Sequence, residues 1–250
     1  MTARQMLCGT AAYGRFQTER SLINRRLLNL LSSTRGYIDQ MSRIAGNLEA
    51  KTSKSTIGIK TKFSERYDLS LGYRVMEALR NYTQHCGLPI DFLTYHSKRV
   101  AGNDRTQLRF YVAIHASRSE LAKDGKFKKK VLKELESHGD SIDLKLMLRD
   151  YVADLAVVHE WFRSKTVKCK TTWEEKYESA IQRFAKAYPQ ALSLKGLAAV
   201  AEDPSTRTDE VNLFPEFIEN QRELVKKNSG AALKQLGILC VSGESAENDA

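Results

Sequence analysis

Apolar residues recur at alternating steps of four and three along one stretch near the start of the chain. The series is Ile23, Leu27, Leu30, Thr34, Tyr37, Met41 and Ile44, in which only Thr34 is polar. Steps of this size keep side chains on one face of an α-helix, so the pattern predicts a long amphipathic helix from Glu19 to about Gly46. Such a helix must bury its stripe against other helices, which constrains the chain to a helical bundle.

Five more helices are predicted further along the chain. The first begins near Ser64 and ends at Gly87, which together with Pro89 is typical of a helix stop. Thr172 and Glu175 match a capping box, which predicts the start of a separate helix. The remaining predicted helices cover residues 144–162, about 193–201, and from Pro215 to about Lys227.

The period of the pattern changes to two after Pro89. The segments DFLTYHSKRV (91–100) and TQLRFYVAIH (106–115) are rich in β-forming residues, the second alternates strictly between its two faces, and they flank the turn-forming segment AGNDR. We expect a β-hairpin at about 91–115 that packs one face on the helices. The predicted fold class is therefore mainly α, a bundle of long amphipathic helices with an inserted β-hairpin and extra C-terminal helices.

The same patterns predict how the chain divides. We expect a helical domain over residues 1–165 that contains the hairpin, and a C-terminal helical extension over residues 166–241. Residues 242–250 (SGESAENDA) predict a disordered acidic tail.

The four cysteines are scattered, which argues against a disulfide framework and a structural zinc site and indicates a reducing compartment. The sequence shows no apolar run of membrane-spanning length and no secretory leader, so we expect a cytoplasmic protein without a membrane partner. Motifs for phosphate-binding loops, dinucleotides or metal ligands do not occur, and we predict no cofactor and no metal.

Charge is spread unevenly along the chain, with a basic body before an acidic tail. Residues 1–100 carry 16 Lys and Arg against 7 Asp and Glu, whereas residues 201–250 carry 5 against 10, within a net charge of +10. A basic body favours a polyanionic partner, of which nucleic acid is the commonest. The candidate RNA-binding residues are Arg118, Lys123, Lys126, Lys128, Lys129, Lys130 and Lys133. A solvated helix face is the alternative explanation of this lysine run.

The segment RNYTQH (80–85) places an arginine and a histidine five residues apart at the end of the second predicted helix. Arg80 could bind a phosphate through its guanidinium group, and His85 could exchange a proton near neutral pH. Asn81 adds a polar group beside them. A purely structural interpretation is also open, in which Arg80 pairs with Glu77 and His85 interacts with the last carbonyls of the helix.

RNYTQH resembles the R-N-x-x-x-H form of the signature of the HEPN (higher eukaryotes and prokaryotes nucleotide-binding) superfamily. The resemblance covers about residues 20–165, and its specific part is this motif. It implies a helical-bundle, metal-independent endoribonuclease of toxin–antitoxin or antiviral-defence type, with Arg80 and His85 catalytic and Asn81 supporting them. It also implies a homodimer that brings two motifs together, and an antitoxin or defence-complex partner.

The chemistry expected of such a site begins with attack of an RNA 2′-hydroxyl on the adjacent phosphorus. His85 would move a proton, and Arg80 would stabilise the negative charge that develops on the phosphoryl oxygens. The main alternative is a non-catalytic RNA-binding or adaptor subunit that uses the same basic surface. A structural helical protein in which Arg80 and His85 only finish a helix is the third possibility.

Overall fold

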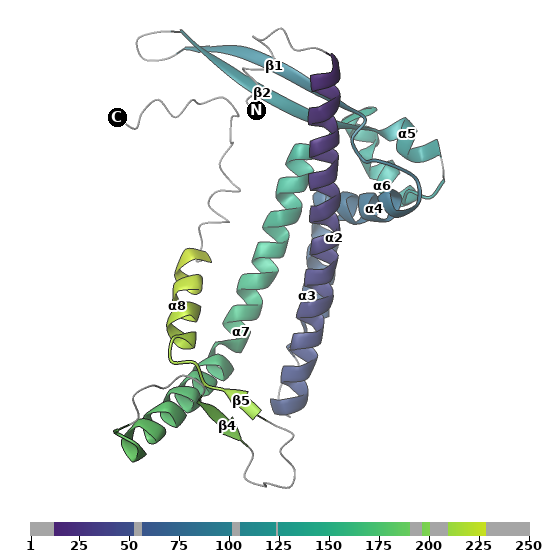
Figure 1. The fold of residues 1–250 in the computed structure, drawn as a ribbon. Coiled ribbons are helices and arrows are strands. Elements are labelled where there is room, and N and C mark those ends of the chain that lie inside the picture. Colours follow the sequence, from purple (N-terminus) through teal and green to yellow (C-terminus); the bar gives the residue numbers. More distant parts are fainter. Residues whose placement is uncertain are drawn as a thin grey trace. The chain divides into compact units, whose positions relative to one another are not determined.

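The computed structural model describes residues 13–52, 57–101, 106–123, 125–190, 197–200 and 210–228. These residues form seven α-helices, one short 3-10 helix and two small antiparallel sheets (Figure 1). The predicted fold class, mainly α with an inserted β-hairpin, is thus confirmed. Within the described ranges, no helix combines the length and the apolar character that a membrane span requires.

The chain divides into two compact units inside one helix, α7 (Leu144–Ala187). The described residues up to Val158 belong to the first unit, and those from His159 belong to the second. The predicted domain boundary at residues 165 and 166 lies in the same helix.

The first unit begins with the long helix α2 (Tyr13–Thr52), which confirms the helix predicted there. Its buried face is offset from the predicted stripe, because Ile23, Leu30, Tyr37 and Ile44 are only half-buried. The side chains that are buried are Leu27, Thr34 and Met41 of the predicted stripe, together with Asn24, Leu31 and Ala45. Asn24 is accommodated inside because its amide bonds both backbone groups of Ile90, at 3.1 and 3.2 Å.

The second predicted helix is in fact two helices, α3 (Ile59–Leu69) and α4 (Leu71–His85). Ser70 separates them with an extended backbone, and its hydroxyl accepts a hydrogen bond from the Tyr73 amide at 3.2 Å, which caps α4. The expectation of one continuous helix is wrong here, because the Ser70 hydroxyl bonds the Tyr73 amide and starts a new helix.

A polar network joins α3 and α4 to the first part of α7. Arg66 of α3 donates to the carboxylate of Asp154, which is only 3% exposed, with an Nε–Oδ1 distance of 2.8 Å. The Tyr151 hydroxyl of α7 donates to Glu77 of α4 at 2.8 Å. The rings of Tyr73 and Tyr151 meet edge to face with centroids 4.9 Å apart. These contacts orient the three helices around a core that also contains Val75, Met76, Leu79 and Val158.

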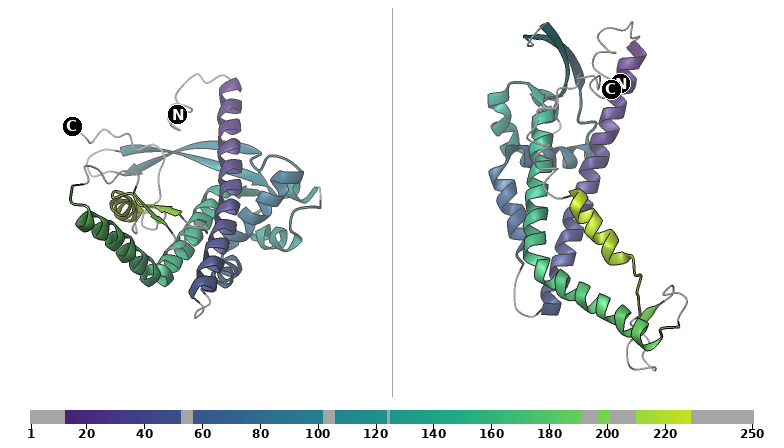
Figure 2. Two further views of the ribbon diagram at one scale, coloured as in Figure 1. Left: turned by 60° about the horizontal axis from the view of Figure 1, so that its bottom comes forward. Right: turned by 90° about the vertical axis from the view of Figure 1, so that its left-hand side faces the viewer.

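The predicted hairpin is confirmed as β1 (Phe92–Ala101) and β2 (Thr106–Ser117), paired antiparallel. A third short strand, β3 (Ser141–Asp143), adds to β2 and completes a three-stranded sheet. Figures 1 and 2 show the hairpin crossing the first turns of α2. The contact includes the rings of Phe16 and Tyr95, whose centroids are 5.6 Å apart.

Two short helices follow the hairpin, α5 (Arg118–Lys123) and α6 (Lys129–Glu134), and α6 continues as the 3-10 helix Leu135–His138. Phe127, Val131 and Leu135 are each buried to 2% exposure or less. Helix α6 contacts α4, beside which it is drawn in Figure 1.

The second unit contains the rest of α7 together with β4 (Ala198–Val200), β5 (Glu210–Asn212) and α8 (Phe217–Asn228). The helix predicted after Pro215 is confirmed as α8. The weak helix predicted at about 193–201 was wrong where it can be checked, because residues 198–200 form a strand paired with β5. Residues 193–196 and the predicted acidic tail at 242–250 lie outside the described residues.

The separate helix predicted from the Thr172–Glu175 capping box was also wrong. α7 continues through this region without interruption. The Thr172 hydroxyl donates to the carbonyl of Lys168 at 3.1 Å, and the Thr171 hydroxyl donates to Val167 at 3.0 Å. Both hydroxyls therefore bond back to the preceding turn of the same helix.

Candidate nucleic-acid interface

Arg80 lies in the last two turns of α4 and is largely buried, with 17% of its side chain exposed. Its Nε atom is 3.6 Å from a carboxylate oxygen of Glu77, one turn earlier. Its Nη2 atom donates to the Asn81 side-chain oxygen at 2.8 Å. The pairing with Glu77 that the structural interpretation expected is therefore present, and Asn81 contacts Arg80 as a supporting residue would.

His85 is the last residue of α4 and its side chain is exposed. The helix is closed by the backbone amide of Cys86, which donates to the Tyr82 carbonyl at 2.8 Å. Among the described residues, no hydrogen bond joins the side chains of His85 and Arg80. The two residues thus differ in environment, since the arginine is held by a carboxylate and the histidine faces solvent.

Five of the seven predicted RNA-binding residues form one exposed cationic surface, which we call the lysine face. It consists of Lys126, Lys128, Lys129, Lys130 and Lys133. These side chains alternate with Phe127 and Val131, which are buried at 2% and 0% exposure. The same short segment is thus anchored on its apolar side and charged on the side toward solvent.

The two remaining predicted residues differ from the lysine face. Lys123 is exposed but pairs with Glu120 at 2.5 Å on α5. Arg118 is half-buried, and its Nε atom is buried without a hydrogen-bond partner among the described residues. Lys123 is therefore partly neutralised by Glu120, and Arg118 is less exposed to a phosphate than the lysines after Gly125 are.

The structure brings RNYTQH into contact with the buried side of the segment that carries the lysine face. The ring of Tyr82, in the middle of the motif, meets the ring of Phe127 edge to face with centroids 6.2 Å apart. Lys128 reaches back to α3, where its ammonium lies 4.9 Å from the centre of the Tyr67 ring and donates to the Tyr67 hydroxyl. No pattern in the sequence predicts that RNYTQH lies beside the segment around Phe127.

A chain of hydrogen-bonded polar side chains also crosses the three-stranded sheet, and it was not predicted. The two ring nitrogens of His115 contact the hydroxyls of Thr94 and Ser141, at 2.8 and 2.9 Å. The Thr94 hydroxyl also contacts His96 at 2.9 Å. The alternation of side chains along a strand places Thr94 and His96 on one face of β1, so their proximity can be predicted from the sequence. The contact with Ser141 cannot, because it depends on the pairing of β3 with β2.

Comparisons of the chain with protein-family models, with curated proteins and with solved structures found no match. The resemblance of RNYTQH to the HEPN signature therefore stays a prediction, and the candidate interface is defined by its own geometry.

Proposed function

We propose that the chain binds RNA, and that the lysine face contacts the phosphate backbone. The observation that carries this proposal is the two-sided construction of the segment from Lys126 to Lys133. Phe127 and Val131 are buried, with Phe127 against Tyr82 of α4, and the five lysines are exposed, one of them, Lys128, beside Tyr67 of α3.

The acidic residue best placed in sequence to neutralise this face is engaged elsewhere. Glu134 follows Lys130 by four residues on α6, which is the spacing of a helical ion pair. Its carboxylate instead accepts from Arg74 of α4, with an Nε–Oε2 distance of 2.8 Å and both side chains mostly buried. The exposed lysines thus keep a dense positive charge that a polyanion can compensate.

Phosphate groups are the natural counter-charge for such a surface. Binding of a nucleic-acid backbone releases condensed counterions, so affinity depends steeply on salt, by about 0.7 log units per log unit of salt for each single-strand phosphate contacted. RNA is favoured over other polyanions because the motif at the end of α4 carries the resemblance to a family of ribonucleases.

The binding proposal is tested by fluorescence anisotropy with a short single-stranded oligouridine at several salt concentrations. We expect the variant Lys129→Ala/Lys130→Ala/Lys133→Ala to bind at least about tenfold more weakly, with a salt slope smaller by about two. The matched control is Lys168→Ala/Lys176→Ala/Lys186→Ala, which removes three exposed lysines from α7. Equal weakening by both variants would show that only net charge matters, and would contradict the proposed interface.

RNA cleavage at Arg80 and His85 is the second candidate function. It is favoured by the exposure of His85 at the end of the helix whose Tyr82 packs on Phe127, within the segment that carries the lysine face. In this mechanism the 2′-oxygen bonds to the adjacent phosphorus and the P–O5′ bond breaks, which leaves a 2′,3′-cyclic phosphate and a 5′-hydroxyl. His85 transfers the proton lost by the 2′-hydroxyl toward the departing 5′-oxygen, and Arg80 stabilises the phosphoryl oxygens. The Glu77 contact opposes it, because Arg80 must then share its charge with a carboxylate. A homodimer that joins two motifs would suit this mechanism, as would control by an antitoxin or defence-complex partner.

Cleavage is tested in EDTA with wild type, Arg80→Ala and His85→Ala. The ribonuclease proposal expects products from wild type alone, and no cleavage of a substrate with a 2′-deoxy substitution at the cleaved position. Cleavage by either variant at the wild-type rate would exclude the assigned roles. RNA binding without cleavage by wild type would leave RNA binding as the function.

A further inference from the structure

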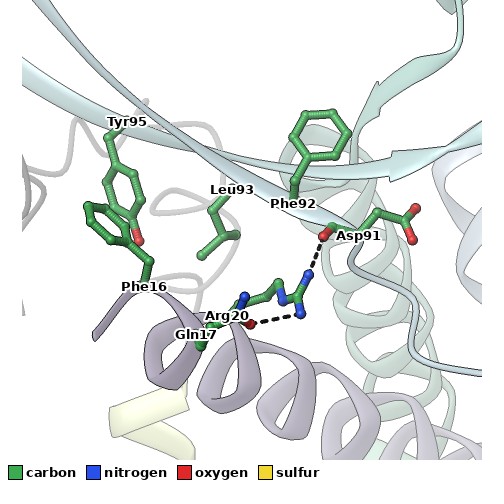
Figure 3. Close-up of a pocket in the computed structure, with 7 residues that line it drawn as sticks. All are labelled: Phe16, Gln17, Arg20, Asp91, Phe92, Leu93 and Tyr95. Carbon is green, nitrogen blue, oxygen red and sulfur yellow. Dashed lines mark hydrogen bonds between the residues drawn. The ribbon is translucent and has the colours of Figure 1, made fainter. Parts of the chain in front are cut away.

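A small pocket lies in the first unit, between the first turns of α2 and the start of β1 (Figure 3). Its volume is about 150 Å³. The residues that line it are Phe16, Gln17, Arg20, Asp91, Phe92, Leu93 and Tyr95. Figure 3 shows Phe16 and Tyr95 on one side and Arg20 with Asp91 on the other, with Leu93 between them.

The polar side of the pocket is held in place by hydrogen bonds. Arg20 donates through Nη1 to the backbone carbonyl of Asp91 and through Nη2 to the side-chain oxygen of Gln17, both at 2.8 Å. The Asp91 carboxylate accepts from the amide of Ser117 at 2.6 Å, which ties the start of β1 to the end of β2. A guanidinium group carries five N–H donors, so Arg20 retains donors beyond these two bonds.

The apolar side of the pocket is aromatic. The rings of Phe16 and Tyr95 stand edge to face at an interplanar angle of 67°. Burial, followed by the charge of Glu19, raises the pKa of the Tyr95 hydroxyl, so this group stays protonated and can act as a donor.

The volume of the pocket limits the size of the ligand that it can bind. A cavity of about 150 Å³ accommodates one benzene-sized ring, whereas drug-sized ligands need about 300 Å³ or more. An aromatic wall opposite an arginine is the arrangement that takes unstacked RNA bases, which stack on aromatic rings or on guanidinium planes.

Exposed arginines occur on the same two elements as the pocket residues, beside one acidic neighbour of Tyr95, Glu19. Arg15, next to Phe16, is exposed, and so are Arg25 and Arg26 further along α2. Arg99 is exposed on β1 and shares the face of the strand with Leu93 and Tyr95. A strand with one base in the pocket would therefore have cationic side chains available for its neighbouring phosphates.

We propose that this pocket binds one pyrimidine base of single-stranded RNA, with the base against the Phe16–Tyr95 pair and its polar edge toward Arg20. This inference rests on the proposed RNA binding and adds a base-contacting site to it. The lysine face would then supply affinity for the backbone, while the pocket would respond to the presence of a base.

Anisotropy with oligouridine and with an abasic strand of equal length separates these contributions. We expect wild type to bind oligouridine more tightly than the abasic strand. Tyr95→Leu, which removes the ring, should weaken oligouridine binding by about 10- to 100-fold and leave abasic binding unchanged. Tyr95→Phe keeps the ring and should retain most of the affinity, and Tyr188→Ala, at an exposed ring in the second unit, should bind as wild type does. Circular dichroism checks that each variant is folded.

The outcomes distinguish this inference from the binding proposal. Equal wild-type affinity for both strands would overturn the pocket and leave backbone binding in place. Absence of binding to either strand would overturn both proposals. Loss of abasic binding by the triple lysine variant, with an unchanged preference for bases, would support the division of roles.

Photocrosslinking of oligouridine that carries 5-iodouridine locates the base directly. We expect the crosslinked tryptic peptides to be residues 16–20 (FQTER) or residues 81–98, and fragmentation of these peptides to place the crosslink at Phe16 or Tyr95 and not at Tyr82 or His85. Crosslinks found only in other peptides would overturn the assignment of the base to this pocket.

Discussion

Gly72, in the first turn of α4, allows this helix to approach the backbone of α7 closely. A Cβ atom at this position would lie 2.6 Å from the carbonyl oxygen of Met147 and 2.8 Å from the Cβ of Asp150. Neither atom is the end of a flexible side chain, so the helices would have to move apart to make room.

We therefore expect Gly72→Ala to lower the free energy of unfolding by about 1–3 kcal/mol. The measurement is urea unfolding followed by circular dichroism. Gly36→Ala in α2 is the matched control, because a Cβ there meets nothing within 4 Å. That variant should gain about 0.5–1 kcal/mol from helix propensity. A Gly72→Ala protein as stable as wild type would show that the α4–α7 crossing adapts freely.

Asn24 shows why the sequence located α2 and part of its buried face correctly but missed the rest of that face. Hydropathy favours Ile23 and Leu30 as inward positions, whereas the structure buries Asn24 and Leu31. Burial of the Asn24 amide is possible because Ile90, 66 residues later, supplies both hydrogen-bond partners. A pattern confined to one helix does not contain that partner.

At the scale of the helices, two short hydroxyl residues have opposite roles. Ser70 caps α4 and separates it from α3, although no break was predicted there. Thr172, which was predicted to begin a helix, bonds back to Lys168 inside α7. Local sequence permits both kinds of bond, and the packing of the helices selects between them.

We expect Ser70→Ala to destabilise the protein by about 1 kcal/mol, because the Tyr73 amide loses its acceptor. Thr172→Ala should cause no loss, since alanine has the higher helix propensity and no cap is removed. Thermal unfolding of the two variants beside wild type gives the comparison. A larger loss for Thr172→Ala than for Ser70→Ala would mean that a helix does begin at Thr172.

At the scale of the folded unit, three tyrosines of the first unit make the free energy of unfolding depend on pH in the alkaline range. Burial raises the pKa of Tyr37 to about 12 from its ordinary value of 10.0. Burial, together with the charge of Glu77, raises the pKa of Tyr73 and of Tyr151 as well. The native state therefore keeps phenolic protons that the unfolded chain releases.

We expect this contribution to stability to be complete below pH 10 and to be lost as the pH rises from 10 toward 12. Tyr73→Phe removes one such proton, so its urea midpoint should fall less steeply with pH than that of wild type. Tyr188→Phe changes an exposed ring and should follow wild type. Parallel curves for wild type and Tyr73→Phe would contradict the role of Tyr73.

The sequence predicts which residues make up the candidate site, but not how these residues are arranged in space. Composition and motif identified Arg80, His85 and the lysines after Gly125, because charge and spacing are visible in the sequence. The contact of Tyr82 with Phe127, 45 positions apart in the numbering, and the diversion of Glu134 to Arg74 depend on how α4 and α6 pack. The pocket beside Phe16 was missed because its walls come from α2 and β1.

The sequence by itself determined the long helix α2, the helical character of the segments that form α3, α4 and α7, the hairpin and the position of the positive charge. These follow from periodicity, turn residues and composition, which act within a few residues of the chain. Only the tertiary structure decided which face of α2 is buried, where α3 gives way to α4, and which residues share a site with RNYTQH. The buried face of α2 and the neighbours of RNYTQH depend on a hydrogen bond or a packed ring supplied by a distant segment, and the free energy of such a contact exists only once the segments have met. The break between α3 and α4 involves a local bond from the Tyr73 amide to Ser70, which competes with continuation of the helix and is selected by how the helices pack.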